Sequence, residues 1–166
     1  MKGRRFSSTL AILVMLLLTL TAAAAADSGT RVSLEPSTTA AYVGDTVNVN
    51  IRISDVSDLY GAEVHIRFDP ARLQALDDDE TQPGVQILPG SLFPIKSDPS
   101  YVAQNQVDNL AGTVDFAMTL LAPELSVSGS GTLATVRFAA KMQGTAQLSW
   151  ISVRSEERRV GKECSC

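Results

Sequence analysis

The sequence is poor in cysteine. It has 166 residues and only two cysteines, Cys164 and Cys166, both within the last three positions. The rest of the chain must therefore fold without disulfides. Two cysteines one residue apart are a weak metal motif, because structural zinc sites take four ligands, usually from two clusters. We predict neither a disulfide scaffold nor a zinc domain.

Basic residues are also scarce in the central part of the chain. Between positions 27 and 153 there are seven basic and 15 acidic residues, a net charge of −8. An acidic surface repels phosphate backbones and anionic lipids. Nucleic acid and membrane surfaces are therefore disfavoured as partners.

Sequence signatures of catalysis are missing as well. The chain has one histidine, His65, and no Gly-x-Ser-x-Gly elbow for a serine nucleophile. Gly129 and Gly131 lack the third glycine and the helix that a dinucleotide site requires. No motif pairs two carboxylates for glycoside hydrolysis. We expect no enzyme activity and no catalytic residue.

The most acidic segment is the run Asp77-Asp78-Asp79-Glu80. Consecutive side chains diverge, whereas a calcium loop spaces its ligands around a turn glycine. We interpret the run as a solvated loop at the end of a strand. No metal site and no cofactor is predicted for this chain.

The N-terminal segment has the three parts of a signal peptide. Lys2, Arg4 and Arg5 precede the apolar run Leu10–Leu20, and Ala24-x-Ala26 fits a cleavage site. The run is shorter than the roughly 20 residues that a membrane-spanning helix needs. We predict a signal peptide over residues 1–26 and export of a mature domain that is not inserted in a membrane. An uncleaved anchor is the alternative.

The other end of the chain loses its pattern after Val153. Residues 154–166 have a single apolar residue other than cysteine, Val160, among four basic and three acidic ones. They resemble read-through at the edge of a sequenced fragment. We expect a disordered or non-native tail over 154–166 and one folded domain over 27–153.

Apolar and polar residues alternate with period two across this domain. Alternation of this kind predicts strands with one buried face, and turn residues such as those of Asp69-Pro70 and Gln143-Gly144 separate them. The expected strands are 47–53, 62–68, 114–120, 134–140 and 148–153, with shorter ones at 31–35, 73–77 and 101–107. The pattern predicts an all-β, two-sheet antiparallel sandwich. By pattern alone, jelly-roll and immunoglobulin-like topologies both fit.

Four segments in order carry a family resemblance. They are the opening Val32–Asn50, the stretch Leu59–Leu73 with its Phe-Asp-Pro turn, the element Leu88–Phe93, and the stretch Gly129–Phe138 with its Gly-x-Gly-x-Leu-x-x-Val-x-Phe pattern. From Val32 to Val153 the sequence resembles the cohesin domain, the receptor half of the cohesin–dockerin pair that assembles cellulosomes. The resemblance implies jelly-roll topology. It also implies that the domain stops before its last strand, which leaves the backbone groups along one edge of the expected strand 31–35 without a partner strand.

The resemblance further implies a function and a site. A cohesin is a secreted, extracellular or cell-surface module that binds a calcium-loaded dockerin through one sheet face, and the calcium belongs to the dockerin. The implied partner contacts are outward-facing strand residues: Gly61, Glu63, His65, Arg67, Gln104, Gln106, Asp115, Thr119 and Ser149. Glu63 stands where the family often has a polar or acidic residue.

Two other functions stay open from the sequence. A carbohydrate-binding module presents a strip of aromatic residues, but this chain has one tryptophan, Trp150, and three tyrosines. Trp150 shares the phase of Leu148, which favours packing in the core or at a sheet edge over a sugar platform. Polysaccharide therefore stays a second partner class. A structural adhesion domain of immunoglobulin-like type is the other alternative.

Overall fold

The computed structural model describes residues 29–93, 102–121 and 126–157, so the expected signal peptide and residues 158–166 lie outside the described residues. The described part contains strands and no helix, and hence no helix that could cross a membrane. In chain order the strands are β1 (Arg31–Pro36), β2 (Thr46–Phe68), β3 (Leu73–Ala75), β4 (Leu88–Pro89), β5 (Val102–Asp108), β6 (Thr113–Thr119), β7 (Val127–Ala140) and β8 (Leu148–Glu157).

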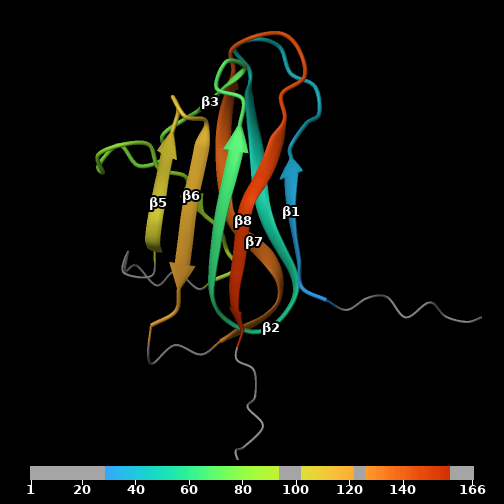
Figure 1. Ribbon diagram of the computed structural model, residues 1–166, viewed down its shortest axis with the longest axis vertical. Helices are drawn as coiled ribbons and strands as arrows, with labels where there is room; N and C mark the ends of the chain where they lie inside the picture. The colour runs from blue at the N-terminus through green and yellow to red at the C-terminus, as the bar shows by residue number, and fades with distance from the viewer. Residues whose placement is uncertain (1–28, 94–101, 122–125, 158–166) are drawn as a thin grey trace, which may run out of the picture.

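The long strand β2 connects the two layers of the molecule (Figure 1). Its first part pairs with β1 and β7, and its second part, from Leu59 on, pairs with β6 and β8. Between them Asp55 and Asp58 adopt positive φ values of 59° and 53°. Aspartate tolerates this left-handed conformation better than most residues. The strands expected at 47–53 and 62–68 are therefore two parts of one bent strand.

Side-chain hydroxyls from β7 hold this bend. The backbone N–H groups of Asp55 and Asp58 donate to Ser130 Oγ and Ser128 Oγ, each at 3.0 Å. These bonds replace the regular ladder where the register of β2 and β7 shifts. Beyond Leu59 β2 no longer pairs with β7, and its second part pairs with β6 and β8 in the other layer.

The two layers are antiparallel sheets packed face to face. One contains β3, β7, the first part of β2 and β1, with β4 added to β7; the other runs β5–β6–β2–β8, strands that lie side by side in Figure 1. The prediction of an all-β antiparallel sandwich with jelly-roll topology is confirmed. Within the described residues β1 pairs only with β2, and the closing strand expected beside it stays a prediction.

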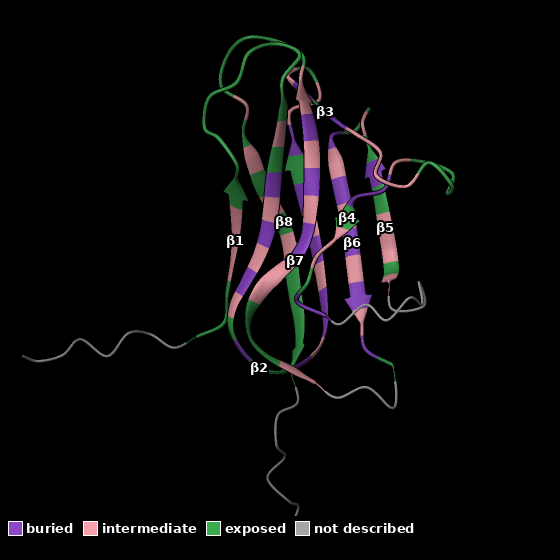
Figure 2. Cartoon of the chain, turned by 180° about the vertical axis from the view of Figure 1, so that it is seen from behind, coloured by how far each residue is buried: buried purple, intermediate pink, exposed green. Residues whose placement is uncertain are grey.

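Apolar residues of alternating phase fill the space between the sheets. Ile51, Val64 and Phe116 are fully buried, and buried and less buried positions alternate along the strands in Figure 2. Phe68 and Phe138 meet edge to face with ring centroids 5.0 Å apart. The inward phase predicted from the sequence is the phase that forms the core.

The last described strand is longer than the sequence indicated. β8 continues four residues past Val153, to Glu157. Ser155 and Glu156 stand opposite Ala62 and Gly61 of β2. Pairing of this kind uses backbone groups, so it does not need an alternating side-chain pattern. The strand thus runs past Val153, where the sequence pattern places the end of the domain. That the tail is non-native stays a prediction.

Candidate functional site

The sheet β5–β6–β2–β8 brings all the sequence-predicted contact residues onto one layer. Four come from the second part of β2, two each from β5 and β6, and one from β8. Residues directly opposite each other on antiparallel strands point to the same side. We call the outward side of this sheet the polar face. It comprises Gly61, Glu63, His65, Arg67, Gln104, Gln106, Asp108, Thr113, Asp115, Ala117, Thr119, Ser149, Ser152, Arg154 and Glu156.

Cross-strand register arranges the polar face in rows. The central row runs from Gln106 through Asp115 and His65 to Ser152. The neighbouring row runs from Gln104 through Ala117 to Glu63. Below these rows lie Val64, Ile66 and Phe116, which are buried. A rigid apolar layer therefore supports a polar surface.

His65 lies at the centre of this face, between two carboxylates. Its Nδ1 is 2.5 Å from Asp115 Oδ1, and its Nε2 is 2.6 Å from Glu63 Oε1. The three side chains are 23 to 32% exposed, so they are accessible but largely packed. Arg154 of β8 adds an exposed contact, with its guanidinium 3.6 Å from Glu63 Oε2.

These contacts shift the pKa values of His65 and Glu63. Hydrogen bonds to Asp115 and then to Glu63 raise the pKa of His65 above its ordinary 6.5. The hydrogen bond from His65, aided by the charge of Arg154, lowers the pKa of Glu63 below its ordinary 4.5. Both shifts favour an imidazolium held by two carboxylates. The trio then carries a net charge of −1.

Sequence reasoning found the members of this face but not their contacts. The contact of His65 with Asp115 could not be predicted, because it depends on the register of β2 and β6 between residues 50 positions apart. Sequence reasoning also left out Ser152, Thr113 and Ala117, which the register places among the predicted residues. The signal that could have identified Thr113 and Ala117 is the outward phase that they share with Asp115 and Thr119.

Two positions differ from the rest of the face. Gly61 is buried, and a Cβ built there would stand 3.3 Å from the Met118 carbonyl oxygen and 3.4 Å from Thr119 Oγ1. It offers a partner little surface of its own. Ile151 is the extra residue of a bulge in β8 and is 51% exposed. It adds an apolar side chain at the β8 edge.

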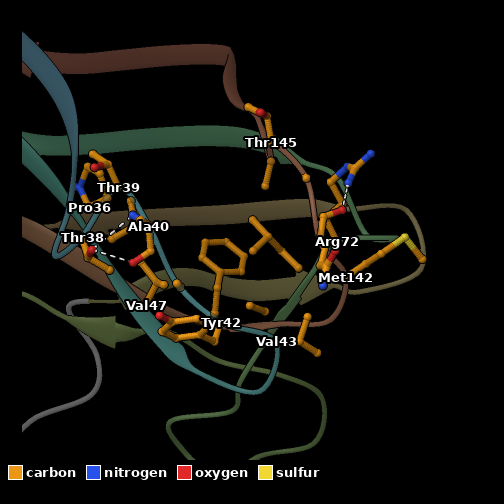
Figure 3. A pocket seen from close by; sticks show the side chains of 18 of the residues that line it. Pro36, Thr38, Thr39, Ala40, Tyr42, Val43, Val47, Arg72, Met142 and Thr145 are labelled. Carbon is orange, nitrogen blue, oxygen red and sulfur yellow. Dashed lines mark hydrogen bonds between the residues drawn. The ribbon is translucent and has the colours of Figure 1, made fainter.

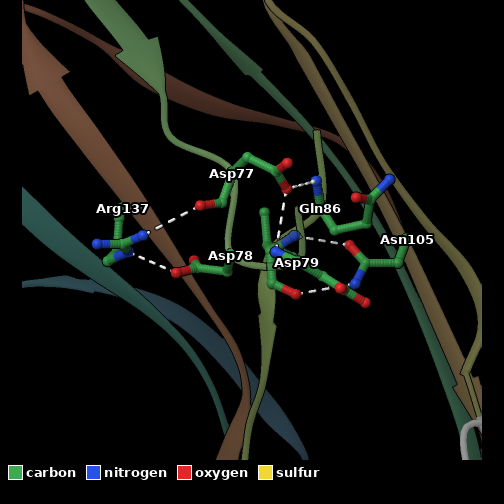
Figure 4. A network of polar contacts seen from close by, with 7 residues as sticks. Asp77, Asp78, Asp79, Gln86, Asn105 and Arg137 are labelled. Atoms are coloured by element: carbon green, nitrogen blue, oxygen red, sulfur yellow. Dashed lines mark hydrogen bonds and ion pairs between the residues drawn. The ribbon is translucent and has the colours of Figure 1, made fainter. Parts of the chain in front are cut away.

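The acidic run forms a structural network (Figure 4). Asp78 Oδ1 lies 2.5 Å from Arg137 Nε on β7, and the Asp78 side chain is 11% exposed. Asp77 accepts the backbone N–H groups of Asp79 and Gln86, which lower its pKa. The expectation of a solvated loop is therefore wrong for Asp78, whose side chain is largely buried against Arg137. These carboxylates anchor the segment between β3 and β4.

No three His, Cys, Asp or Glu side chains gather as a metal site in residues 29–93, 102–121 and 126–157. That the chain needs no cofactor stays a prediction.

A hollow of about 860 Å³ opens at one end of the sandwich (Figure 3). Val47, Phe138 and Leu148 contribute to its apolar lining, and Tyr42 and Met142 lie at its exposed rim. Trp150 does not reach it but packs against the core, as its phase predicted. Tyr42 is the aromatic residue with a largely exposed side chain in the described part, at 85%. One such residue does not make a sugar platform.

Fold and surface together define an all-β sandwich domain with one polar sheet face. The family model of the cohesin domain matches residues 32–156. The chain therefore belongs to the cohesin family, whose members are non-catalytic interaction modules. The resemblance predicted from the sequence is confirmed.

Known proteins agree with this assignment. Cell surface glycoprotein 1 of Acetivibrio thermocellus is 27% identical over 123 residues, which are 70% of this chain and 5% of that protein. This chain thus spans a small part of the relative's length. A type II cohesin domain from the cellulosome of Acetivibrio cellulolyticus superposes with a TM-score of 0.61 at 20% identity, covering 74% of this chain and 75% of that one. The cohesin of a type II cohesin–X–dockerin complex from the same organism gives 0.56 at 16% identity, covering 74% and 77%.

Proposed function

We propose that this chain is a secreted, non-catalytic docking module that binds a calcium-loaded dockerin through the polar face. The observation that carries the proposal is the gathering of the contact residues on one accessible sheet. Nine positions scattered from Gly61 to Ser149 in the sequence come together over four adjacent strands. Membership of the cohesin family supports the same partner, since solved relatives are complexes of cohesin with dockerin.

The composition of the polar face suits selective docking. Acidic, basic and hydroxyl side chains are mixed within it, as with Glu63, Arg67 and Thr119. Charged groups at such an interface govern association rate and partner choice more than raw affinity. In this proposal the calcium belongs to the dockerin, and the domain itself binds none.

Localisation and wider role follow from the same proposal. The N-terminal 26 residues direct export, and the matched relative bears the name of a cell-surface glycoprotein. We infer that the domain acts outside the cell, recruiting dockerin-bearing enzymes or surface proteins for polysaccharide breakdown. The domain itself does not hold the polysaccharide, because Trp150 packs against the core and Tyr42 is isolated at the hollow.

A binding panel tests this function. The mature domain, residues 27–157, is challenged with calcium-loaded dockerins, including the type II X–dockerin of Acetivibrio cellulolyticus, and in parallel with insoluble cellulose. We expect capture of at least one dockerin, loss of that capture when a chelator removes calcium, and no retention on cellulose. The chelator should leave the thermal unfolding of the domain alone unchanged. Retention on cellulose with no dockerin captured would contradict the proposal.

A further inference from the structure

The two carboxylates of the polar face would repel each other without the histidine between them. Glu63 and Asp115 belong to adjacent strands and occupy neighbouring rows, a diagonal relation in which side chains still reach one another. His65 separates them and contacts an oxygen of each at 2.6 and 2.5 Å. The placement of both acids therefore depends on this ring.

The ring can hold both acids only when it is protonated. A neutral imidazole has one N–H donor and one acceptor nitrogen, whereas the imidazolium donates from both nitrogens. Carboxylates accept but do not donate once ionised. Loss of the proton consequently breaks one of the two contacts. It also changes the net charge of the trio from −1 to −2.

Other charged and polar groups surround the trio on every strand of the sheet. They are Arg67 on β2, Gln106 and Asp108 on β5, Thr113 on β6, and Ser152, Arg154 and Glu156 on β8. Of these, Arg154 contacts Glu63 through a largely exposed side chain, at 76%. Solvent screens such a contact, so it holds Glu63 less firmly than His65 does.

The geometry also leaves acceptors for a partner. His65 engages Oε1 of Glu63 and Oδ1 of Asp115, so the second oxygen of each carboxylate is not used by the ring. Glu63 Oε2 has only the exposed guanidinium of Arg154 near it, at 3.6 Å, and ordered carboxylate oxygens of this kind suit hydroxyl, amide or ammonium donors. Ordering them before docking lowers the entropy cost of the complex.

We propose that His65 is a positioning residue of the docking face: its imidazolium holds Glu63 and Asp115 as an ordered acceptor pair, so that dockerin binds tightly while the ring is protonated and more weakly once it is not. This inference rests on the proposed function and concerns the regulation of the same surface.

The direction of the pH dependence follows from the two shifts. The raised pKa of His65 means that the contribution of its imidazolium is fully present below pH 6.5 and is lost as the pH rises through the folded-state value. The lowered pKa of Glu63 means that its contribution is present above pH 4.5 and is lost as the pH falls through its folded-state value. Docking should be strongest between these two transitions.

One arm of the test needs no partner. The chain has a single histidine, so its ring resonances in the free domain report His65 alone. We expect an NMR titration midpoint above 6.5, moving down in both Glu63→Gln and Asp115→Asn. A midpoint at or below the ordinary value would overturn the trio itself.

The second arm measures the dissociation constant for the tightest dockerin of the panel at constant calcium and ionic strength. Between about pH 6 and about pH 9 we expect a weakening of roughly tenfold, the cost of ordering one or two side chains. His65→Gln should bind weakly and with no pH dependence, while remaining folded at the temperature of the binding measurement. An equal pH dependence in His65→Gln would place the titrating group on the dockerin and overturn the inference. Absence of binding at every pH would instead overturn the proposed function.

Discussion

Replacing Glu63 and Asp115 together by lysine weakens dockerin binding at least about 30-fold, the smallest loss usual when one partner of a charged contact that docking desolvates is removed. The substitution removes both acceptors of the central trio and places two cations beside His65 and Arg67. Repulsion then acts within the polar face as well as toward the donors of a partner. Isothermal titration calorimetry measures the loss.

A matched variant separates local contacts from overall charge. Glu35→Lys with Glu80→Lys makes the same change in net charge at two exposed positions outside the polar face. We expect it to change affinity less than about threefold, since exposed pairs such as Glu35 with Arg52 contribute little. Equal losses in both variants would indicate long-range attraction in place of contact at the face. Unchanged binding by the Glu63 and Asp115 variant would mean that the face is misassigned.

Phe116→Ala destabilises the domain by about 3–5 kcal/mol, the usual cost of removing a buried phenyl ring. Phe116 is fully buried on β6, directly beneath the polar face and opposite Val64. Small domains have unfolding free energies of only about 5–15 kcal/mol. A large share of the stability is therefore lost, and urea denaturation reports it as a lower midpoint.

The control for this prediction is another apolar residue of the same hairpin. Leu110, in the β5–β6 turn, is 93% exposed. Leu110→Ala should change the free energy of unfolding by less than about 0.5 kcal/mol. A cost below about 1 kcal/mol for Phe116→Ala would mean that the second sheet does not pack on the first as described.

Most of the strands could be predicted from the alternation of apolar and polar residues, because each apolar position in the pattern is a residue that the folded domain buries. Val64, Ile66 and Phe68 are inward in the sequence pattern and buried in the structure. The bend in β2 could not be predicted in the same way. The bend depends on the left-handed conformations of Asp55 and Asp58 and on hydrogen bonds from their backbone N–H groups to serine hydroxyls of β7. The sequence around the two aspartates does not indicate those hydrogen bonds.

The candidate site was predictable as a set of residues but not as a network. Outward phase selected His65 and Asp115 separately, yet their contact depends on the β2–β6 register. Asp78 shows the same limit. Its run of acids suggested solvation, whereas tertiary structure gives it Arg137 as a partner. Charge patterns in sequence indicate where carboxylates are, and only packing determines which cations meet them.

Amide chemical-shift mapping tests the docking face most directly. Unlabelled calcium-loaded dockerin is added to the ¹⁵N-labelled domain, and perturbed backbone amides are placed on the strands. If dockerin binds the polar face, the perturbed amides lie on β5, β6, β8 and residues 59–68 of β2 and are centred on His65. The amides of β1, β3 and β7 then stay largely unchanged. Perturbations centred on β1 and β7, or around the hollow at Tyr42, would contradict binding at this face.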